Sequence, residues 1–318
     1  MTHPAPRLML LDTASLYFRA FFGVPDSFRA PDGTPVNAVR GLLDFIARLV
    51  GEYSPTHLVC AWDNDWRPQW RVDLIPSYKA HRVEAEVAGP APDVEEVPDP
   101  LVAQIPVILD VLSALGISVV GADGYEADDV IGTLATTAGM PVDIVSGDRD
   151  LFQLVDDGRE VRVLYVARGV SRHERVTNDV VREKYGVDAT QYADFATLRG
   201  DSSDGLPGVA GVGEKTAATL LQRYGDIPRL LAAAADPAST LAPGPRAKLR
   251  GALDYLAVAP QVVAVARDLP LGTIDAELPL SPPDHTRVVE VGARWGLDSP
   301  LARVVIAMAG RDGQSSEE

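Results

Sequence analysis

Val142-Asp143-Ile144-Val145-Ser146-Gly147-Asp148-Arg149-Asp150 is the stretch that decides the fold of this chain. Its first five residues are rich in valine and isoleucine and predict a strand over Val142–Ser146, and a glycine and two aspartates follow closely. A segment with helical spacing precedes this strand at about Glu126–Ala138, and another strand follows at Val161–Val166. Such alternation of strands and helices predicts an α/β fold with a mostly parallel central sheet and helices on both faces.

The same alternation extends outward from this stretch. Further strands are predicted at Arg7–Leu11, His57–Trp62 and Ile117–Val120, and further helices at Val36–Tyr53 and Leu101–Leu115. Beyond residue 176 the pattern is helical, at Asn178–Tyr185, Ala189–Leu198, Glu214–Tyr224, Ile227–Ala235, Arg246–Val258 and Pro283–Trp295. We therefore expect an α/β core over residues 1–176, a smaller helical lobe over 177–310 and a disordered tail over 311–318.

The composition indicates a soluble, reduced protein. The chain has 318 residues, of which 46% are hydrophobic, and it contains no apolar run of the roughly 18 residues that a membrane span requires. Its single cysteine, Cys60, has no partner for an internal disulfide, which is typical of a cytoplasmic protein. The net charge of −16 taken alone favours ordinary acidic solubility over a nucleic-acid partner, so the positions of the acids decide the question.

Acids recur just past the predicted strand ends and again at the start of the helical lobe. Glu126 and Asp129 are three residues apart and share a helix face, and Asp201 and Asp204 repeat that spacing. In a parallel sheet the carboxyl ends of the strands share one edge, and ligand sites form outside it. Nine carboxylates could therefore converge there: Asp12, Asp63, Glu126, Asp128, Asp129, Asp148, Asp150, Asp201 and Asp204.

Converging carboxylates would repel one another strongly unless cations lay between them. Hard divalent cations prefer oxygen ligands, and no histidine lies in these motifs, so the sequence disfavours zinc and predicts two or more Mg²⁺ or Mn²⁺ ions. For any single acid the alternative is helix N-capping, because Asp and Glu interact well with the first turn of a helix. A set distributed over four strand ends favours the metal site.

A glycine-rich passage, Gly205-Leu206-Pro207-Gly208-Val209-Ala210-Gly211-Val212-Gly213, stands directly before a helix that begins Glu214-Lys215-Thr216. Free backbone N–H groups at such a helix start suit a phosphate. Glu214 separates Gly213 from Lys215 and no strand precedes the passage, so this is not a Walker A loop. An ordinary turn between two helices is the alternative.

A basic cluster follows Asp63. It consists of Arg67, Arg71, Lys79, His81 and Arg82, and Trp62, Trp66, Trp70 and Tyr78 are interleaved with these residues. Bases alternating with aromatic residues suit phosphate neutralisation and base stacking on a single strand. The alternative is solvated charge over partly buried tryptophans.

In chain order these motifs resemble the 5′-nuclease family, which comprises flap endonucleases and the N-terminal 5′–3′ exonuclease domain of bacterial DNA polymerase I. The resemblance covers about residues 7–310. It is carried by Leu10-Leu11-Asp12, Ala61-Trp62-Asp63, the stretch from Arg71 to Arg82, Gly124-Tyr125-Glu126-Ala127-Asp128-Asp129, Ser146-Gly147-Asp148-Arg149-Asp150, and the passage from Gly200 to Ala217.

The resemblance implies a PIN-like nuclease core, a helical arch over about residues 78–105, and a helix–three-turn–helix at about 198–222 that grips duplex DNA and binds K⁺ through backbone carbonyls. It implies that the nine acids are metal ligands and that Lys79, Arg82, Asp128 and Asp148 act in catalysis. DNA contacts are implied for Arg71, Tyr78, Lys79, Arg82, Gly211, Gly213, Lys215 and Thr216. Two departures stand out: Thr13 replaces an expected glycine, and residues 83–100 carry six acids and no bases.

The implied activity is that of a stand-alone, structure-specific 5′ nuclease that leaves 5′-phosphates during primer and flap removal in DNA replication and repair. Its substrates would be 5′ flaps, nicks, duplexes with a 5′ single strand and RNA-primed 5′ ends. We expect a monomer at the bacterial nucleoid, without a membrane partner, that works with a separate DNA polymerase and ligase. One alternative is a catalytically weak DNA-junction binding protein of the same fold. A dehalogenase-type phosphatase would need an aspartate where Ala14 stands.

Overall fold

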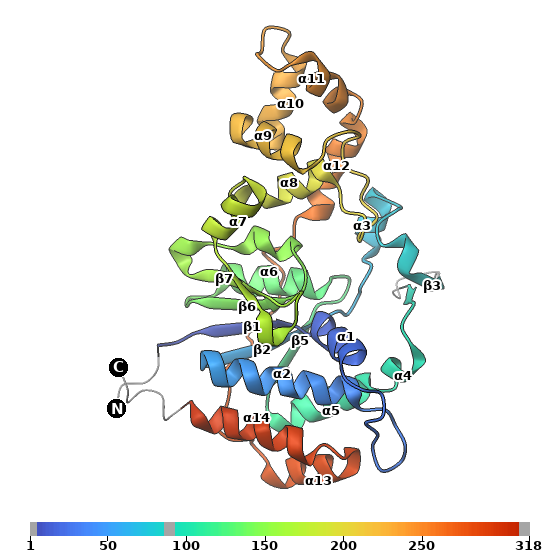
Figure 1. The fold of residues 1–318 in the computed structure, drawn as a ribbon, viewed down its shortest axis with the longest axis vertical. Coiled ribbons are helices and arrows are strands. Elements are labelled where there is room, and N and C mark those ends of the chain that lie inside the picture. The colour runs from blue at the N-terminus through green and yellow to red at the C-terminus, as the bar shows by residue number, and fades with distance from the viewer. Residues whose placement is uncertain (1–4, 86–92, 312–318) are drawn as a thin grey trace.

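The computed structural model describes residues 5–85 and 93–311, and a mostly parallel sheet lies at its centre (Figure 1). Within the described residues six strands pair in the order β5-β2-β1-β6-β7-β8. Their bounds are β1 (Leu8–Asp12), β2 (His57–Trp62), β5 (Ser118–Gly121), β6 (Val142–Ser146), β7 (Val161–Tyr165) and β8 (Glu174–Val176). Among these six strands only β7 and β8 pair antiparallel, so the predicted parallel strands are confirmed and β8 is an addition to them.

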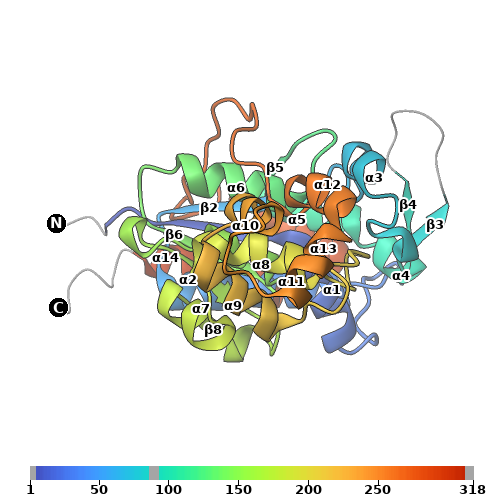
Figure 2. The ribbon, with the colours of Figure 1, turned by 90° about the horizontal axis from the view of Figure 1, so that it is seen from above.

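Both faces of the sheet are buried. Alternate residues of β1 belong to two different hydrophobic clusters, with Leu8 and Leu10 in one and Met9 and Leu11 in the other. One face carries α1 (Thr13–Gly23), α2 (Asn37–Tyr53), α5 (Ile105–Leu115), α13 (His285–Trp295) and α14 (Asp298–Gly310), and the other carries α6 (Ala127–Thr137) (Figures 1 and 2). Burial on both sides explains why the strands are almost continuously apolar.

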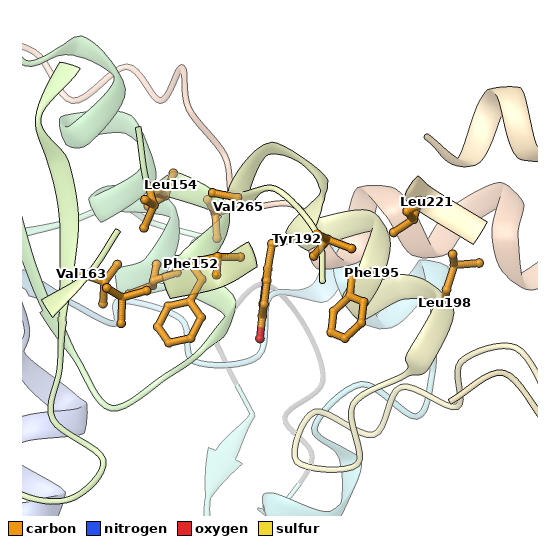
Figure 3. Packing of buried hydrophobic residues seen from close by; sticks show 14 of the residues in the cluster. Phe152, Leu154, Val163, Tyr192, Phe195, Leu198, Leu221 and Val265 are labelled. Carbon is orange, nitrogen blue, oxygen red and sulfur yellow. The ribbon is translucent and has the colours of Figure 1, made fainter. Parts of the chain in front are cut away.

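The helical lobe stands above one edge of this core. It contains α7 (Asn178–Tyr185), α8 (Tyr192–Arg199), α9 (Glu214–Tyr224), α10 (Ile227–Ala235), α11 (Pro243–Arg250) and α12 (Leu253–Val263). One hydrophobic cluster runs from Val163 in the sheet through Phe152, Tyr192 and Phe195 to Leu221 in the lobe (Figure 3). Because the two parts share this core, the lobe has a defined position relative to the edge of the sheet.

The predicted boundaries of the lobe are corrected at their C-terminal end. α13 and α14 lie within 177–310, yet α14 packs on α2 and α13 on α5, on the face of the sheet opposite α6. The chain leaves the lobe after α12 and runs back along the sheet, where the N–H of Leu58 donates to the carbonyl of Ala276 at 2.8 Å. The apolar faces of both helices are then covered by α2 and α5 rather than by the lobe.

Two predicted helices are each divided in two. The segment Leu101–Leu115 becomes α4 (Asp99–Val102) and α5, with the buried Gln104 between them. The Gln104 amide oxygen accepts from the N–H of Ala38 at 2.8 Å, so this residue satisfies the start of α2 instead of continuing a helix. The segment Arg246–Val258 likewise becomes α11 and α12.

The expected helical arch over residues 78–105 lies partly outside the described residues. In the described parts, a turn of 3₁₀-helix, Ala80–Arg82, leads into β3 (Val83–Ala85), which pairs antiparallel with β4 (Val94–Glu95), and α4 follows. The expected tail also lies mostly outside them, at residues 312–318. Its first residue, Arg311, is buried and donates to the carbonyls of Pro55 and Met308, which corrects the tail's predicted start. Among the residues that the structure describes, no helix is long and apolar enough to cross a membrane.

Candidate active site

A cleft of about 420 Å³ opens at the carboxyl ends of the parallel strands, beneath the helical lobe. Six of the nine predicted acids line it: Asp12, Asp63, Glu126, Asp128, Asp148 and Asp201. Lys79, Arg82 and Arg149 also line the cleft, together with Glu95 from β4. The expected convergence of acids from several strand ends is therefore confirmed for most of the set.

Asp12 is both the end of β1 and the N-cap of α1. Its Oδ1 accepts from the N–H of Ser15 at 3.1 Å, and its Oδ2 accepts from the hydroxyl of Ser146 at 2.5 Å. The capping alternative thus applies to Asp12 without excluding a second role. Burial, with Asp63 and Asp148 nearby, raises the pKa of Asp12 to about 7, although the two hydrogen bonds oppose the rise. The departure at Thr13 is accommodated, because its hydroxyl donates to the carbonyl of Leu11.

Asp63 and Asp128 face the same cleft from β2 and α6. Asp63 Oδ1 accepts from the N–H of Ala127 at 2.8 Å, which places the end of β2 against the first turn of α6. Burial raises the pKa of Asp63, and burial together with the charges of Asp12 and Asp148 raises the pKa of Asp128 well above its usual value. These carboxylates would share one region of negative charge that nothing in their own surroundings neutralises fully.

Glu126 is held by cations and a phenol. Its Oε1 accepts from the hydroxyl of Tyr78 at 2.6 Å and from Arg71 Nη1 at 3.2 Å, while its Oε2 forms an ion pair with Lys79 Nζ. Lys79 is itself buried, and its backbone adopts the left-handed conformation with a φ of 47°. The predicted catalytic lysine therefore lies in the cleft, already paired with a predicted metal ligand.

Asp129 does not line the cleft, and its contacts favour a structural role over the predicted role as a metal ligand. It is fully buried, and its two oxygens accept bidentate bonds of 2.8 Å from Arg71. The same oxygens accept from the N–H groups of Ala266 at 2.8 Å and Glu126 at 3.2 Å, so a metal ion would have to displace existing donors. The helix-capping alternative holds for this residue, because Glu126 and Asp129 form a capping box at the start of α6.

Arg71 and Tyr78 are likewise not placed to contact DNA. Arg71 on α3 (Gln69–Leu74) is 3% exposed, and Tyr78 is 4% exposed. Arg71 Nε also donates to the carbonyl of Val262 at the end of α12, so the side chain ties the lobe to α6. Arg67 is buried too and forms an ion pair with Asp93. Two of the five bases of the predicted cluster, Arg67 and Arg71, are thus structural, since their charges are needed to satisfy buried acids and carbonyls.

The acids that follow β6 and α8 form the other side of the site. Asp148 lines the cleft, whereas Asp150 lies behind it with a buried Oδ1 that has no hydrogen-bond partner among the described residues. Burial and the charges of Asp148 and Asp204 raise the pKa of Asp150. Asp201 pairs with Arg199 at 3.0 Å, and hydrogen bonds from Ser203 lower the pKa of Asp201 despite burial.

A close backbone contact brings Asp204 beside Lys79 and Arg82. Gly205 has a φ of +69°, and a Cβ on it would meet the carbonyl oxygen of Ser77 at 2.0 Å, so only glycine fits here. The N–H of Lys79 donates to the carbonyl of Asp204 at 3.0 Å, and Arg82 forms an ion pair of 3.3 Å with its carboxylate. Asp204 does not line the cleft itself, but this contact sets Lys79 and Arg82 beside the acids.

The glycine passage lies apart from the cleft, on the lobe. Gly213 is the N-cap of α9 with no side-chain hydrogen bond, and Lys215 in the first turn is exposed. Gly208 and Gly211 have φ values of +67° and +73°. The start of α9 is therefore open for an anion, as predicted for Gly211, Gly213, Lys215 and Thr216, and their contact with DNA remains a prediction.

Several residues of the cleft were not predicted from the sequence. Arg149 was not among the predicted site residues, although its position between the predicted acids Asp148 and Asp150 indicated it. Glu95 had none, because it belongs to an acidic segment with no recognisable pattern; β3 and β4 bring it into the cleft, where burial raises its pKa. The hydroxyl of Ser146 donates to the carboxylate of Asp12, and its oxygen accepts from the N–H of Asp148 at 2.9 Å. Ser146 therefore holds two acids of the site in position.

The donor set fits divalent cations. All candidate ligands are carboxylate oxygens, several with raised pKa values that an added positive charge would lower again. Within residues 5–85 and 93–311, no three acids already form a compact ligand cage. The unpartnered Oδ1 of Asp150 is nonetheless an oxygen available to an ion or to the water around it.

The Asp12 pKa gives a prediction for stability in EDTA. An acid whose folded pKa is raised from 3.8 to about 7 makes the folded state bind the extra proton, so stability should fall as the pH rises through that interval. The expected loss in the free energy of unfolding is on the order of 4 kcal/mol between about pH 4 and pH 7. Urea unfolding at several pH values measures it.

Asp12→Asn is the control for this slope and should reduce it, and the slope that remains comes from the other acids with raised pKa values, among them Asp128 and Asp150. Saturating Mg²⁺ should also flatten the wild-type profile, because a bound cation favours the ionised carboxylates. Equal slopes for the wild type and Asp12→Asn would contradict the assignment of the titration to Asp12.

Comparisons with known proteins agree with this geometry. Two family models match the chain: "5′-3′ exonuclease, N-terminal resolvase-like domain" over residues 7–186 and "5′-3′ exonuclease, C-terminal SAM fold" over residues 187–286. A 5′-3′ exonuclease of Streptomyces coelicolor is 61% identical over 300 residues, which are 94% of this chain and 99% of that one. A 5′-3′ exonuclease of Mycobacterium tuberculosis is 52% identical over 309 residues, which are 95% and 97%.

A solved structure extends the likeness to the fold as a whole. The flap endonuclease of bacteriophage T5, in a pseudo-enzyme–product complex with DNA and metal ions, has a TM-score of 0.63 to this chain. The match covers 97% of this chain and 100% of that one at 18% sequence identity. At this level of identity the match shows a similar fold and nothing further.

Proposed function

This chain belongs to the 5′-3′ exonuclease family and is therefore a nuclease, and we propose that it cleaves DNA phosphodiesters near a 5′ end, both as a flap endonuclease and as an exonuclease. The observation that carries the proposal is the cleft in which six carboxylates and the pair Lys79 and Arg82 meet. Acids and bases in one open site suit a substrate that is itself anionic and is bound through cations.

The acids divide into two groups by their positions. Asp12, Asp63, Asp128 and Asp148 line the cleft and would hold the inner divalent ion, Mg²⁺ or Mn²⁺. Asp150, Asp201 and Asp204 lie on the side of the helical lobe and would hold a second ion, partly through water. When bound, such ions lower the pKa of an attacking water and neutralise charge on the phosphate. The T5 enzyme with DNA and metal ions supports this class of cofactor.

The side chains of the cleft have distinct tasks in the reaction. Glu126 keeps Lys79 in the cleft, and Asp204 keeps Arg82 there, so both cations are positioned before substrate arrives. We propose that Lys79 and Arg82 contact the non-bridging oxygens of the scissile phosphate, where negative charge increases in the transition state. In-line attack of water on phosphorus then breaks the bond to the 3′ oxygen and leaves a 5′-phosphate on the product.

The setting we propose is primer and flap removal beside a separate DNA polymerase and ligase. The substrates would be 5′ flaps, nicks and duplexes with a DNA or RNA 5′ strand. The lobe supplies the duplex-binding surface, because its glycine passage leaves the start of α9 open to a phosphate. The acidic residues Glu84, Glu95, Glu96 and Asp99 near Arg82 form an unusual entrance for a single strand, since they repel its phosphates.

Cleavage of end-labelled flap, nicked-duplex and single-strand substrates tests the proposal. With Mg²⁺ or Mn²⁺ we expect products cut near the junction of the flap and shorter products from the nick. EDTA should abolish cleavage while duplex binding measured by fluorescence anisotropy stays largely intact, because the lobe binds DNA without the acids. Cleavage that persists in EDTA would contradict the assignment of a metal-dependent reaction. DNA binding without cleavage in the presence of either Mg²⁺ or Mn²⁺ would favour the alternative of a junction-binding protein.

A further inference from the structure

The glycine turn of the lobe carries a cation of its own. Lys248 on α11 donates from Nζ to the carbonyl oxygen of Gly211 at 2.7 Å. The lysine stem lies along the turn, because a Cβ added to Gly211 would meet Nζ at 3.1 Å and Cε at 3.2 Å. The left-handed conformation of Gly211 therefore leaves the space in which the ammonium group sits.

The other two bases of α11, Arg246 and Arg250, anchor the helix that carries Lys248. Arg246 donates to the carbonyls of Ala233 and Ala234 at 3.2 and 3.0 Å, and Arg250 Nε donates to Ala234 at 3.1 Å. These arginines cap the C-terminal end of α10, where carbonyls lack partners within the helix. α11 is thus anchored along one side, and Lys248 is its remaining basic side chain, whose Nζ reaches the carbonyl of Gly211 in the glycine turn.

The resemblance to 5′ nucleases led us to expect potassium on the backbone carbonyls of this turn, but the carbonyl of Gly211 does not fit that expectation. An ammonium group and a potassium ion carry the same charge and seek the same oxygen ligands, so one excludes the other from this position. We propose that Lys248 replaces the monovalent cation at the glycine turn, and that the lobe binds duplex DNA without needing K⁺.

The proposal explains how positive charge reaches the turn in a chain with so few lysines. Only Lys79, Lys184, Lys215 and Lys248 occur in the sequence, and Lys215 stands in the first turn of α9 beside the same passage. Two ammonium groups then flank the open start of α9, where a phosphate of the duplex would bind. The inference rests on the proposed function only in taking duplex DNA as the ligand.

Duplex affinity in different monovalent cations tests the substitution. Anisotropy of a labelled duplex with a 5′ overhang would be measured in EDTA with the full chain, in K⁺, Na⁺ or tetramethylammonium chloride at equal ionic strength. For the wild type we expect dissociation constants within about twofold of one another. For Lys248→Met we expect binding about tenfold weaker in tetramethylammonium, because one charged hydrogen-bonding group is lost, with much of the affinity restored by K⁺.

Lys184→Met is the matched control, because Lys184 is an exposed lysine of the same lobe that is paired with Glu174 instead. It should leave both affinity and cation dependence unchanged. A wild type that binds much more tightly in K⁺ would overturn the proposal. So would a Lys248→Met variant with full affinity, or one whose loss is the same in all three salts, since Lys248 would then be absent from binding or an ordinary phosphate contact. The readout is independent of cleavage, so failure of the nuclease assignment would appear separately.

Discussion

Asp128→Ala is expected to lower the rate of flap cleavage by about a thousandfold or more, which corresponds to roughly 4 kcal/mol of transition-state stabilisation. The carboxylate lines the cleft at the start of α6, and burial and the charges of Asp12 and Asp148 raise its pKa. An acid in that environment is retained at a cost in stability, and a cation is the partner that offsets the cost. Single-turnover cleavage at saturating enzyme isolates the chemical step.

The folded state should survive this substitution. A raised folded pKa means that the ionised carboxylate destabilises the fold at neutral pH, so the free energy of unfolding in EDTA should stay the same or rise. Asp254→Ala, at an exposed acid of α12, is the control for general effects of removing charge and should keep the wild-type rate. Near-normal turnover by Asp128→Ala would refute the placement of the metal site.

Arg71→Met is expected to have the largest effect on stability, lowering the free energy of unfolding by about 3–5 kcal/mol. The substitution leaves Asp129 buried without its bidentate partner and removes a donor from Glu126 and from the carbonyl of Val262. Asp129→Asn should cause a loss of similar size, since it leaves the guanidinium without a counter-charge. Urea unfolding in EDTA measures both without any contribution from bound metal.

This experiment also decides between the two roles considered for Asp129. A metal ligand would lose metal affinity and keep its stability in EDTA, whereas a structural ion pair loses stability whether or not metal is present. Arg287→Met provides the control, because Arg287 pairs with Asp110 on the surface and should contribute less than about 1 kcal/mol. An unchanged unfolding midpoint for both Arg71→Met and Asp129→Asn would show that the buried network is dispensable.

Much of the fold could be predicted because its periodicity is local. β2 and β6, and helices α7, α9 and α10, have the predicted bounds, since each is a short run of one pattern between clear breaks. The elements that were missed or divided depend on distant contacts. Gln104 interrupts a helical pattern to bind the start of α2, and β8 pairs with β7 at the antiparallel edge of the sheet. Nothing within either segment signals such a partner.

For the candidate site, the sequence likewise predicted the features that depend on local position. Acids placed after strands must reach one edge of a parallel sheet, so Asp12, Asp63 and Asp148 could be grouped from the sequence. Which neighbours each acid meets could not be derived this way. Glu126 and Asp129 share one spacing signal, yet only Glu126 lines the cleft, because Arg71 holds Asp129 in the core with two hydrogen bonds and donates a single one to Glu126.

The sequence by itself determined the sheet, the helical lobe and the chemistry of the edge, because hydrophobic periodicity and residue type need no knowledge of distant partners. Only the tertiary structure decided which charges remain available. Arg67, Arg71 and Tyr78 stand in a pattern suited to DNA and are buried, while Lys248 stands in no pattern and reaches Gly211. The physical reason is that a buried charge must find a partner, and that partner is chosen by packing across the chain and not by its neighbours in sequence.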